Sequence, residues 1–379
     1  MTTLRVIVDQ IVAPNPGGIG RYTEELTREI IRRAPTGCHV AGIVSSSPES
    51  DYELIETLLP GLEGLFKSAL ARRELELAWQ HGFTRLPGSG MVHATGLFAP
   101  LFKHDRVNNV GEQIAVTIHD VIPWTNPEVL SARRLGWYKA MVKRAYKYAD
   151  AVVVPTHAVA SQLSGIYDFG DRVRVIGGAV SSKLTLPVDP DARAERLNLP
   201  ERFILSVGTL QAHKGIASLI QAMARPQLGG YTLLIAGPEG SQGVDVDAIA
   251  SEAGLAEGRV RALGYLADAD LAVALDRASV FAFPSLAEGF GLPVIEAFHF
   301  GTPVVHSDDP AVLEVSAGAG LAVAREPRDS YAERLGDAIG AVLTDPVLAE
   351  RMGFAGRDRA RTFSWSDSAE KVWQLHADL

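Results

Sequence analysis

Residues 283–305, FPSLAEGFGLPVIEAFHFGTPVV, carry the clearest structural signal in the chain. They contain a glycine-rich loop followed by an apolar helical stretch at 292–300, set between the apolar runs VFAFPS (280–285) and TPVVHSD (302–308). A strand, a glycine-rich turn, a helix and another strand in this order are typical of a parallel sheet covered by helices. The segment therefore predicts an α/β domain.

The same alternation continues through the rest of the chain. In the second half, further strands are predicted at 203–209, 231–237 and 260–265, with helices at 215–224 and 269–278. In the first half, helices are predicted at 19–33, 131–148 and from 157, between the runs LRVIVDQIV, HVAGIVS, MVHAT, IAVTIHD, AVVVPT and VRVIG. These strands are apolar on both faces, as in buried parallel sheets. We therefore expect two doubly wound α/β domains.

The length of 379 residues also favours two domains. We expect an N-terminal domain at 1–180 and a C-terminal domain at 202–362. The segment between them, 181–201, is polar and contains proline, which is typical of an interdomain linker. Residues 363–379 begin with Ser and Asp residues and predict a terminal helix.

The composition excludes several classes of protein. With 47% hydrophobic and 21% charged residues, the chain has the composition of a folded soluble protein. It has no apolar run near the roughly 18 residues of a membrane span, and its start lacks the layout of a signal peptide, so we expect a cytoplasmic protein. A single cysteine, Cys38, excludes an intrachain disulfide and a thiolate zinc cluster.

Charge is distributed unevenly along the chain. Residues 1–180 hold 19 basic and 18 acidic residues, whereas residues 181–379 hold 17 and 27. The acidic total and the lack of a groove-reading or base-stacking motif exclude nucleic acid as a partner. The predicted helix 131–148 has an apolar stripe of Leu135, Tyr138, Val142 and Ala145, and six cations without an acid: Arg133, Arg134, Lys139, Lys143, Arg144 and Lys147. We favour a solvated basic face; the alternative is peripheral contact with an anionic membrane surface at its inner face.

Two motifs of the first domain follow predicted strands, where ligands of parallel sheets bind. In NPGGIGRYTEELTREI (15–30), glycines precede a helix, so backbone amides could approach an anion at the helix start. The alternative is a tight strand-to-helix turn. His119, followed by Asp120, closes another strand and predicts a residue facing the ligand. His93 also ends a strand, but we interpret it as a structural histidine.

The second domain offers a lysine and two carboxylates. Lys214 follows a strand and precedes a helix, a position that suits a diphosphate, although a solvated lysine is the alternative. Glu288 lies in the glycine-rich loop and Glu296 about one turn into the next helix. Carboxylates at these places can accept hydrogen bonds from sugar hydroxyls and from a ribose diol.

Together, the E-x7-E segment, the GGIGRY loop, the HD strand end and the VGTL…KG turn resemble the retaining GT-B glycosyltransferases of family four, the glycosyl transferases group 1. The resemblance covers nearly the whole chain. It implies two Rossmann-like domains facing a central cleft, with the C-terminal helix crossing back to the first domain. It also implies transfer of a sugar from a nucleotide diphosphate to an acceptor hydroxyl, with retained anomeric configuration and without a metal or cofactor.

The resemblance also assigns site residues. It implies that His119 lines the reaction centre, that Lys214 holds the diphosphate and that Glu288 binds the donor sugar. The implied donor-binding residues are Gly17, Gly18, Arg21, Thr209, His213, Gly289, Phe290, Gly291, Leu292 and Glu296.

One departure from the family concerns an arginine that usually accompanies the lysine. The two positions where it occurs hold Thr209 and His213 here. Because a neutral imidazole offers one donor where a guanidinium offers a fork, we expect another basic group to substitute, and Arg21, beside the first glycine loop, is one candidate. Three D-x-D patterns, at Asp189, Asp245 and Asp268, are expected from the acidic composition, and we assign no metal to them.

We therefore expect a retaining hexosyltransferase that acts on a nucleotide diphosphate sugar. The VGTL form of the turn resembles bacterial mannosyltransferases, which favours mannose carried on GDP. The acceptor would be a glycan or lipid-linked sugar in the synthesis of cell-envelope glycan, glycolipid or polysaccharide. Two alternatives remain open: a nucleotide-sugar epimerase or hydrolase of the same fold, and a catalytically silent nucleotide-sugar-binding protein, which the missing arginine motivates.

Overall fold

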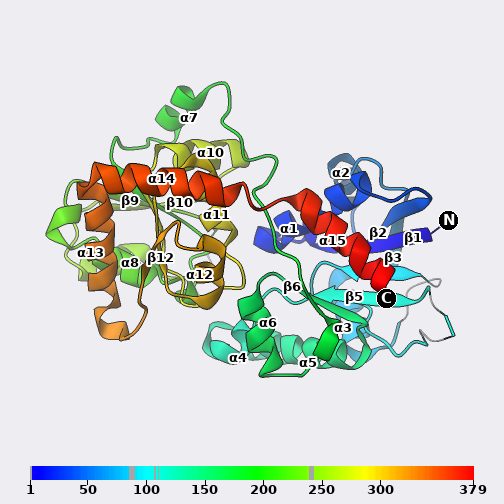
Figure 1. Cartoon of the computed structure of the whole chain (residues 1–379). Helices are drawn as coiled ribbons and strands as arrows, with labels where there is room; N and C mark the ends of the chain where they lie inside the picture. The colour runs from blue at the N-terminus through cyan, green and yellow to red at the C-terminus, as the bar shows by residue number, and fades with distance from the viewer. Residues whose placement is uncertain (1, 85–89, 106–107, 110, 239–242) are drawn as a thin grey trace. The chain divides into compact units, whose positions relative to one another are not determined.

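The computed structural model describes residues 2–84, 90–105, 108–109, 111–238 and 243–379. The chain divides into two compact units, Met1–Gly178 with Ser364–Leu379, and Ala179–Phe363. Each unit contains one sheet whose strands are all parallel and alternate with helices (Figure 1). This is the α/β class that the alternation of apolar runs predicts.

The sheet of the first unit has the strand order β3-β2-β1-β4-β5-β6-β7. Its strands are β1 (Thr2–Ile7), β2 (Cys38–Ser46), β3 (Leu65–Ala71), β4 (Met91–Ala94), β5 (Gln113–Thr117), β6 (Ala151–Val154) and β7 (Val173–Val175). The order reverses between β1 and β4, where Val6 is paired with His93. At such a reversal the carboxyl ends of parallel strands open a crevice for ligands.

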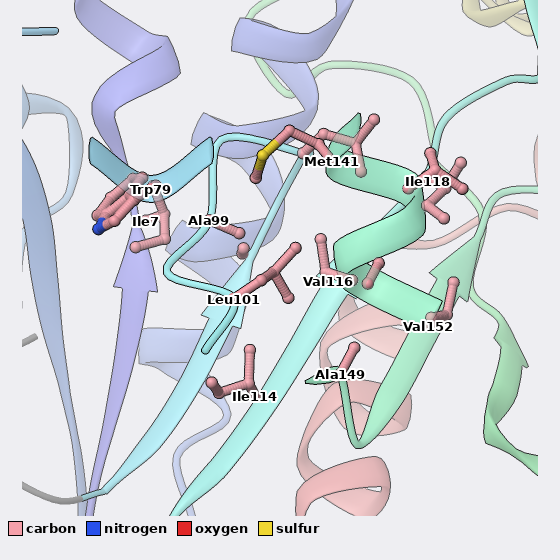
Figure 2. Packing of buried hydrophobic residues seen from close by; sticks show 14 of the residues in the cluster. Ile7, Trp79, Ala99, Leu101, Ile114, Val116, Ile118, Met141, Ala149 and Val152 are labelled. Atoms are coloured by element: carbon pink, nitrogen blue, oxygen red, sulfur yellow. The ribbon is translucent and has the colours of Figure 1, made fainter. Parts of the chain in front are cut away.

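The helices of the first unit connect these strands. They are η1 (Asp9–Val12), α1 (Gly17–Arg32), α2 (Glu49–Leu58), α3 (Arg72–His81), α4 (Ile122–Thr125), η2 (Pro127–Val129), α5 (Ala132–Tyr148), α6 (His157–Ser164), η3 (Gly170–Arg172) and α15 (Trp365–Asp378). Figure 2 shows part of the core: Ile7, Val116 and Val152 of the strands share one buried cluster with Trp79 of α3 and Met141 of α5. Each side chain of this kind contributes about 1.5–3 kcal/mol on burial, so the cluster anchors the strand ends.

The sheet of the second unit has the order β10-β9-β8-β11-β12-β13, with its reversal between β8 and β11. Its strands are β8 (Phe203–Val207), β9 (Thr232–Ala236), β10 (Val260–Gly264), β11 (Val280–Phe283), β12 (Val304–Ser307) and β13 (Leu321–Val323). Its helices are α7 (Pro190–Arg196), η4 (Ala212–Lys214), α8 (Ile216–Ala222), η5 (Pro226–Leu228), α9 (Val246–Glu252), α10 (Asp268–Arg277), α11 (Leu292–Phe300), α12 (Pro310–Ser316), η6 (Arg328–Ser330), α13 (Tyr331–Thr344) and α14 (Pro346–Ala360). Two buried clusters hold the sheet against these helices.

The segment predicted as a linker, 181–201, folds with the second unit instead. It contains α7, in which Arg193 donates to Asp189 at 2.7 Å and to Asp270 of α10 at 2.8 Å. Leu184 of the same segment is buried in the core of the unit. The polar residues that suggested a linker are therefore, in part, partners in ion pairs with α10.

The predicted helix 131–148 forms as α5, but its buried stripe is rotated from the one expected. Trp137 and Met141 are buried with Val142 and Ala145, whereas Leu135 and Tyr138 are only partly covered. Two of the six cations are engaged, because Arg134 pairs with Glu76 and Arg144 donates to the Leu101 carbonyl. The exposed cations that remain are Arg133, Lys139, Lys143 and Lys147.

The C-terminal helix α15 packs on α1 of the first unit. Trp373 donates its indole N–H to the Ile30 carbonyl at 3.0 Å, and Ser368 donates to the Gly177 carbonyl at 2.9 Å. The predicted return of the terminal helix to the first domain is thereby confirmed. Within the described ranges, each helix is too short or too polar to span a lipid bilayer.

Candidate active site

The strand reversal of the second unit brings Lys214 and Glu288 together. Lys214 ends the short helix η4 after β8, and Glu288 lies in the loop after β11. The Lys214 Nζ is 2.6 Å from Glu288 Oε1, and the two side chains are 20% and 11% exposed. The two residues that the sequence singles out separately therefore form one ion pair at the place where a parallel sheet binds ligands.

The turn that carries Lys214 is locked to the loop that carries Glu288. Gly215 has φ +68°, and a Cβ at this position would lie 2.2 Å from the Pro284 carbonyl oxygen, so only glycine fits. The Leu286 N–H donates to the His213 carbonyl at 2.7 Å. These close backbone contacts hold the ion pair in place.

The glycine-rich loop ends at the start of α11. Gly291 is the N-cap residue, with φ +92°, and Leu292 begins the helix without a side chain capping its first amides. Phe290 packs edge-on against Phe363, with ring centroids 5.7 Å apart. Glu296 lies within α11 and is 3% exposed. Gly289 lies in the same loop, so the predicted phosphate cradle has the expected backbone form: glycines followed by a helix start.

The two residues in place of the usual arginine occupy different settings. Thr209 is partly exposed and donates its hydroxyl to the Gln211 amide oxygen at 3.3 Å. His213 is buried, at 7% exposure, next to Lys214.

Sequence reasoning missed Arg325, which follows the short strand β13. Its guanidinium donates to Asp308 at 2.8 Å, to Asp309 at 3.3 Å and to the Leu286 carbonyl in the loop after β11. Burial raises the pKa of Asp309 to about 6, and the nearby Arg325 charge opposes the rise. Arg325 therefore connects the loop after β11, through the Leu286 carbonyl, with the carboxylates of Asp308 and Asp309. Its position just after a strand is the same signal that identified Lys214.

In the first unit, a pocket lies at the reversal between β1 and β4. Its walls come from the carboxyl ends of β1, β4 and β5 and from α3 and α5, and its polar lining includes Gln10, Arg72, Glu76, Asp120 and Arg134. Two of these residues carry a signal in the sequence: Asp120 directly follows His119, and Arg134 belongs to the basic helix α5. Gln10, Arg72 and Glu76 carry no local signal, because the fold alone brings them together.

His119 lines this pocket with a defined protonation state. Its Nε2 lies 2.7 Å from the Thr95 carbonyl, which can only accept, so Nε2 carries the proton and Nδ1 has a free lone pair. Burial lowers its pKa to about 4, so the ring is neutral near pH 7. Tyr22 of α1 packs edge-on against the ring at 4.9 Å between centroids. His119 can accept a hydrogen bond from a ligand hydroxyl, but it supplies no charge.

The predicted anion site at the GGIGRY loop coincides with the start of α1. Gly17 and Gly18 are exposed and begin the helix, and Arg21 is partly exposed one turn further on. The short helix η1 separates this loop from β1, and Gln10 of η1 donates to the Pro16 carbonyl at 3.2 Å.

Two further sequence interpretations can be placed. His93 is fully buried and its Nδ1 lies 3.3 Å from Nε2 of His376 on α15, which confirms its structural role. Carboxylates of the D-x-D patterns pair with arginines: Asp189 with Arg193, Asp191 with Arg277, and Asp270 with Arg193 and Arg196. Among the described residues, no group of three or more His, Cys, Asp and Glu side chains is placed to hold a metal ion.

Comparisons with known proteins agree across both units. Residues 16–183 match the model described as Glycosyltransferase Family 4, and residues 188–359 match Glycosyl transferases group 1. The chain is 30% identical to the O-antigen chain mannosyltransferase B of Escherichia coli over 273 residues, 68% of each chain. It is 27% identical to the MMP alpha-(1->4)-mannosyltransferase of Mycolicibacterium hassiacum, over 94% of this chain and 93% of that one. Anabaena HepE, solved with UDP-glucose, shares the fold, with a TM-score of 0.72 and 19% identity over the whole of both chains.

Proposed function

The chain belongs to the family 4, group 1 glycosyltransferases, and we propose that it is a retaining mannosyltransferase that uses GDP-mannose in the synthesis of cell-envelope glycan. Two relatives with mannosyltransferase in their names support mannose as the transferred sugar. The observation that carries the proposal is the Lys214–Glu288 pair at the β8/β11 reversal, beside a glycine-rich helix start. HepE with UDP-glucose supports a nucleotide sugar as donor.

The proposed reaction divides the work among residues of the second unit. The bond between the anomeric carbon and the diphosphate oxygen breaks, and an acceptor hydroxyl forms the new bond on the same face. Lys214 and the amides at the start of α11 stabilise the charge that develops on the diphosphate. The departing oxygen takes the proton of the acceptor hydroxyl, so no protein base is needed. Glu288 accepts hydrogen bonds from the donor sugar, and Glu296 binds the ribose.

We also propose binding roles for residues of the first unit. His119 accepts a hydrogen bond from a sugar hydroxyl through Nδ1, and the amides at Gly17 and Gly18 bind phosphate. Arg21 supplies the charge that the family's usual arginine would bring. Arg21→Ala should therefore lower turnover roughly ten- to a hundredfold, the scale of one charge-assisted hydrogen bond. Wild-type turnover in this variant would place the second cation elsewhere.

Incubation with radiolabelled nucleotide sugars tests the activity. GDP-mannose, UDP-glucose and UDP-galactose are offered with mixed glycan acceptors, and the anomeric configuration of the product is read by proton NMR. We expect an α-linked mannoside product with the wild type, at least a hundredfold loss in Lys214→Ala, and no loss in Lys371→Ala, an exposed lysine of α15. An isomerised or hydrolysed donor would favour the epimerase or hydrolase, and binding without turnover the silent protein.

Two finer proposals concern metal and location. EDTA should leave transfer substantially intact, because Lys214 and backbone amides compensate the diphosphate charge; complete loss that magnesium reverses would contradict this.

We propose a cytoplasmic protein in which the exposed cations of α5 form a solvated face. Co-sedimentation with phosphatidylglycerol vesicles at physiological salt would instead indicate peripheral membrane contact.

A further inference from the structure

We infer that the pocket of the first unit binds the acceptor as an uncharged sugar ring and discriminates against phosphorylated acceptors. This inference rests on the proposed transferase function and concerns the substrate that the second unit does not bind. The pocket lies at the β1/β4 reversal and is lined by groups that donate and accept hydrogen bonds. Its charge balance and its hydrogen-bonding groups determine which ligand fits.

The two arginines that line the pocket, Arg72 and Arg134, already have carboxylate partners. Arg72 donates to the Asp9 carboxylate, which is 1% exposed, and to the Gln10 amide oxygen at 2.6 Å. Arg134 pairs with Glu76 at 3.1 Å and stacks on the Trp137 ring, 4.3 Å from its centroid. Each arginine in the described lining is thus already paired with a carboxylate.

The carboxylates of the lining disfavour an anionic ligand. Asp120 adds another carboxylate to the lining, and the neutral His119 adds no charge. A phosphate would therefore meet arginines whose charge is already balanced and would lie near two carboxylates, Glu76 and Asp120. Like charges in a partly desolvated pocket cost free energy, so phosphorylated ligands are disfavoured.

The polar side chains of the lining can form hydrogen bonds with the hydroxyl groups of a ligand. Carboxylates of Glu76 and Asp120 accept from hydroxyls, and Arg134 donates to them. A ring rich in hydroxyl groups matches this set of donors and acceptors.

A ligand-observed NMR titration of the full chain tests the inference, and it is run with saturating GDP so that the sugar phosphates do not bind at the proposed diphosphate site of Lys214. The probes are two matched pairs: methyl α-D-mannopyranoside with α-D-mannose 1-phosphate, and methyl α-D-glucopyranoside with α-D-glucose 1-phosphate. We expect at least one methyl glycoside to bind at least tenfold more tightly than its phosphate. Equal or tighter binding of the phosphates, or no binding of any probe, would overturn the inference.

Variants test whether the lining residues are responsible. Glu76→Gln removes the partner of Arg134 at constant size, and we expect it to tighten binding of the sugar phosphate at least fivefold while weakening the methyl glycoside. Asp120→Asn should weaken the methyl glycoside at least tenfold. Glu56→Gln, an exposed carboxylate of α2, is the matched control and should change neither. Selectivity that is unchanged in both pocket variants would assign recognition to another place.

GDP binding, measured on the same samples by calorimetry, separates this inference from the proposed function. Normal GDP binding with phosphate-selective sugar binding would remove the inference and leave the transferase proposal in place. Absent GDP binding and absent GDP-mannose turnover in the wild type would remove the transferase proposal, while the NMR titration would still report whether the pocket selects uncharged sugars. Urea unfolding followed by tryptophan fluorescence, which reports the first unit, shows whether Glu76→Gln and Asp120→Asn are folded.

Discussion

At the scale of single residues, the ion pair between Lys214 and Glu288 is the most consequential contact of the second unit. The two side chains are mostly buried, at 20% and 11% exposure, so their charges interact with little screening by solvent. A diphosphate that approaches Lys214 therefore meets an ammonium already neutralised by a carboxylate. Under the proposed function, Glu288 would oppose nucleotide binding while it favours binding of the sugar.

Neutralising Glu288 should consequently separate the two effects. In Glu288→Gln, we expect GDP to bind roughly three- to tenfold more tightly, because Lys214 is released for the phosphates, while turnover falls at least tenfold. Calorimetry with GDP and steady-state transfer measure the two quantities. Glu296→Gln is the comparison and should weaken GDP binding instead, because we propose that it holds the ribose. An equal loss of GDP affinity in both variants would contradict this division of roles.

At the scale of elements, the turn between β8 and α8 and the loop after β11 act as one structural piece. The Gly215 backbone approaches Pro284 so closely that any side chain would collide with a carbonyl. Gly254 has nearly the same φ, +70°, but nothing within 4 Å of its added Cβ. The two positions therefore share the backbone strain of a left-handed residue and differ in the collision.

Gly215→Ala should weaken GDP binding at least tenfold and destabilise the second unit by about 2–4 kcal/mol, because the turn must move away from the loop. Gly254→Ala should cost only about 1 kcal/mol of backbone strain and leave GDP binding unchanged. Calorimetry and urea unfolding followed by circular dichroism provide the measurements. Equal effects of the two substitutions would show that strain, and not the contact with Pro284, governs the site.

The C-terminal helix is a second element whose role can be measured. Trp373 is 8% exposed and bonds to the Ile30 carbonyl, whereas Gln374 on the next position is exposed. Trp373→Ala should lower the free energy of unfolding of the first unit by about 3–5 kcal/mol, because it removes a buried indole and leaves a carbonyl unpaired. Gln374→Ala should change it by less than about 0.5 kcal/mol. A similar stability in both variants would show that α15 contributes little to the first unit.

At the scale of the whole molecule, the two units can be observed separately. All five tryptophans belong to the first unit, at positions 79, 124, 137, 365 and 373. Intrinsic tryptophan fluorescence therefore reports the unfolding of that unit. The first unit also holds three histidines whose pKa values are lowered by desolvation: His93 and His119 to about 4, and His376.

These histidines should make the first unit sensitive to acid. Below about pH 6.5 the unfolded chain binds protons that the folded chain does not bind until about pH 4, so stability falls as the pH decreases across this window. For His93 and His119, whose pKa values fall to about 4, the loss is on the order of 2 kcal/mol each at pH 5. His104 acts in the opposite direction, because its bond to Asp150 raises its pKa. Urea unfolding followed by tryptophan fluorescence at pH 7.5, 6 and 5 measures the net effect, and equal midpoints at all three values would contradict it.

The sequence by itself determined the class of fold and the family, because both depend on local patterns. Apolar strands that alternate with amphipathic helices imply parallel sheets, and the candidate site residues His119, Lys214 and Glu288 each follow the end of a strand. The edge strand β3 was not predicted, because most of its residues are exposed and its sequence shows no apolar run. The linker interpretation of 181–201 was wrong because charged residues that pair with α10 look the same in sequence as solvated ones.

Only the tertiary structure decided which of these residues meet. Lys214 and Glu288 lie 74 positions apart, and their contact depends on β8 and β11 being neighbours in the sheet. The acceptor pocket and the bracing Arg325 likewise join residues from distant elements, and neither has a motif of its own. The structure also shows which charges are balanced: Arg134 lies on the basic helix α5, but its charge is paired with that of Glu76. Such long-range contacts follow from strand order and packing, which no local pattern in the chain encodes.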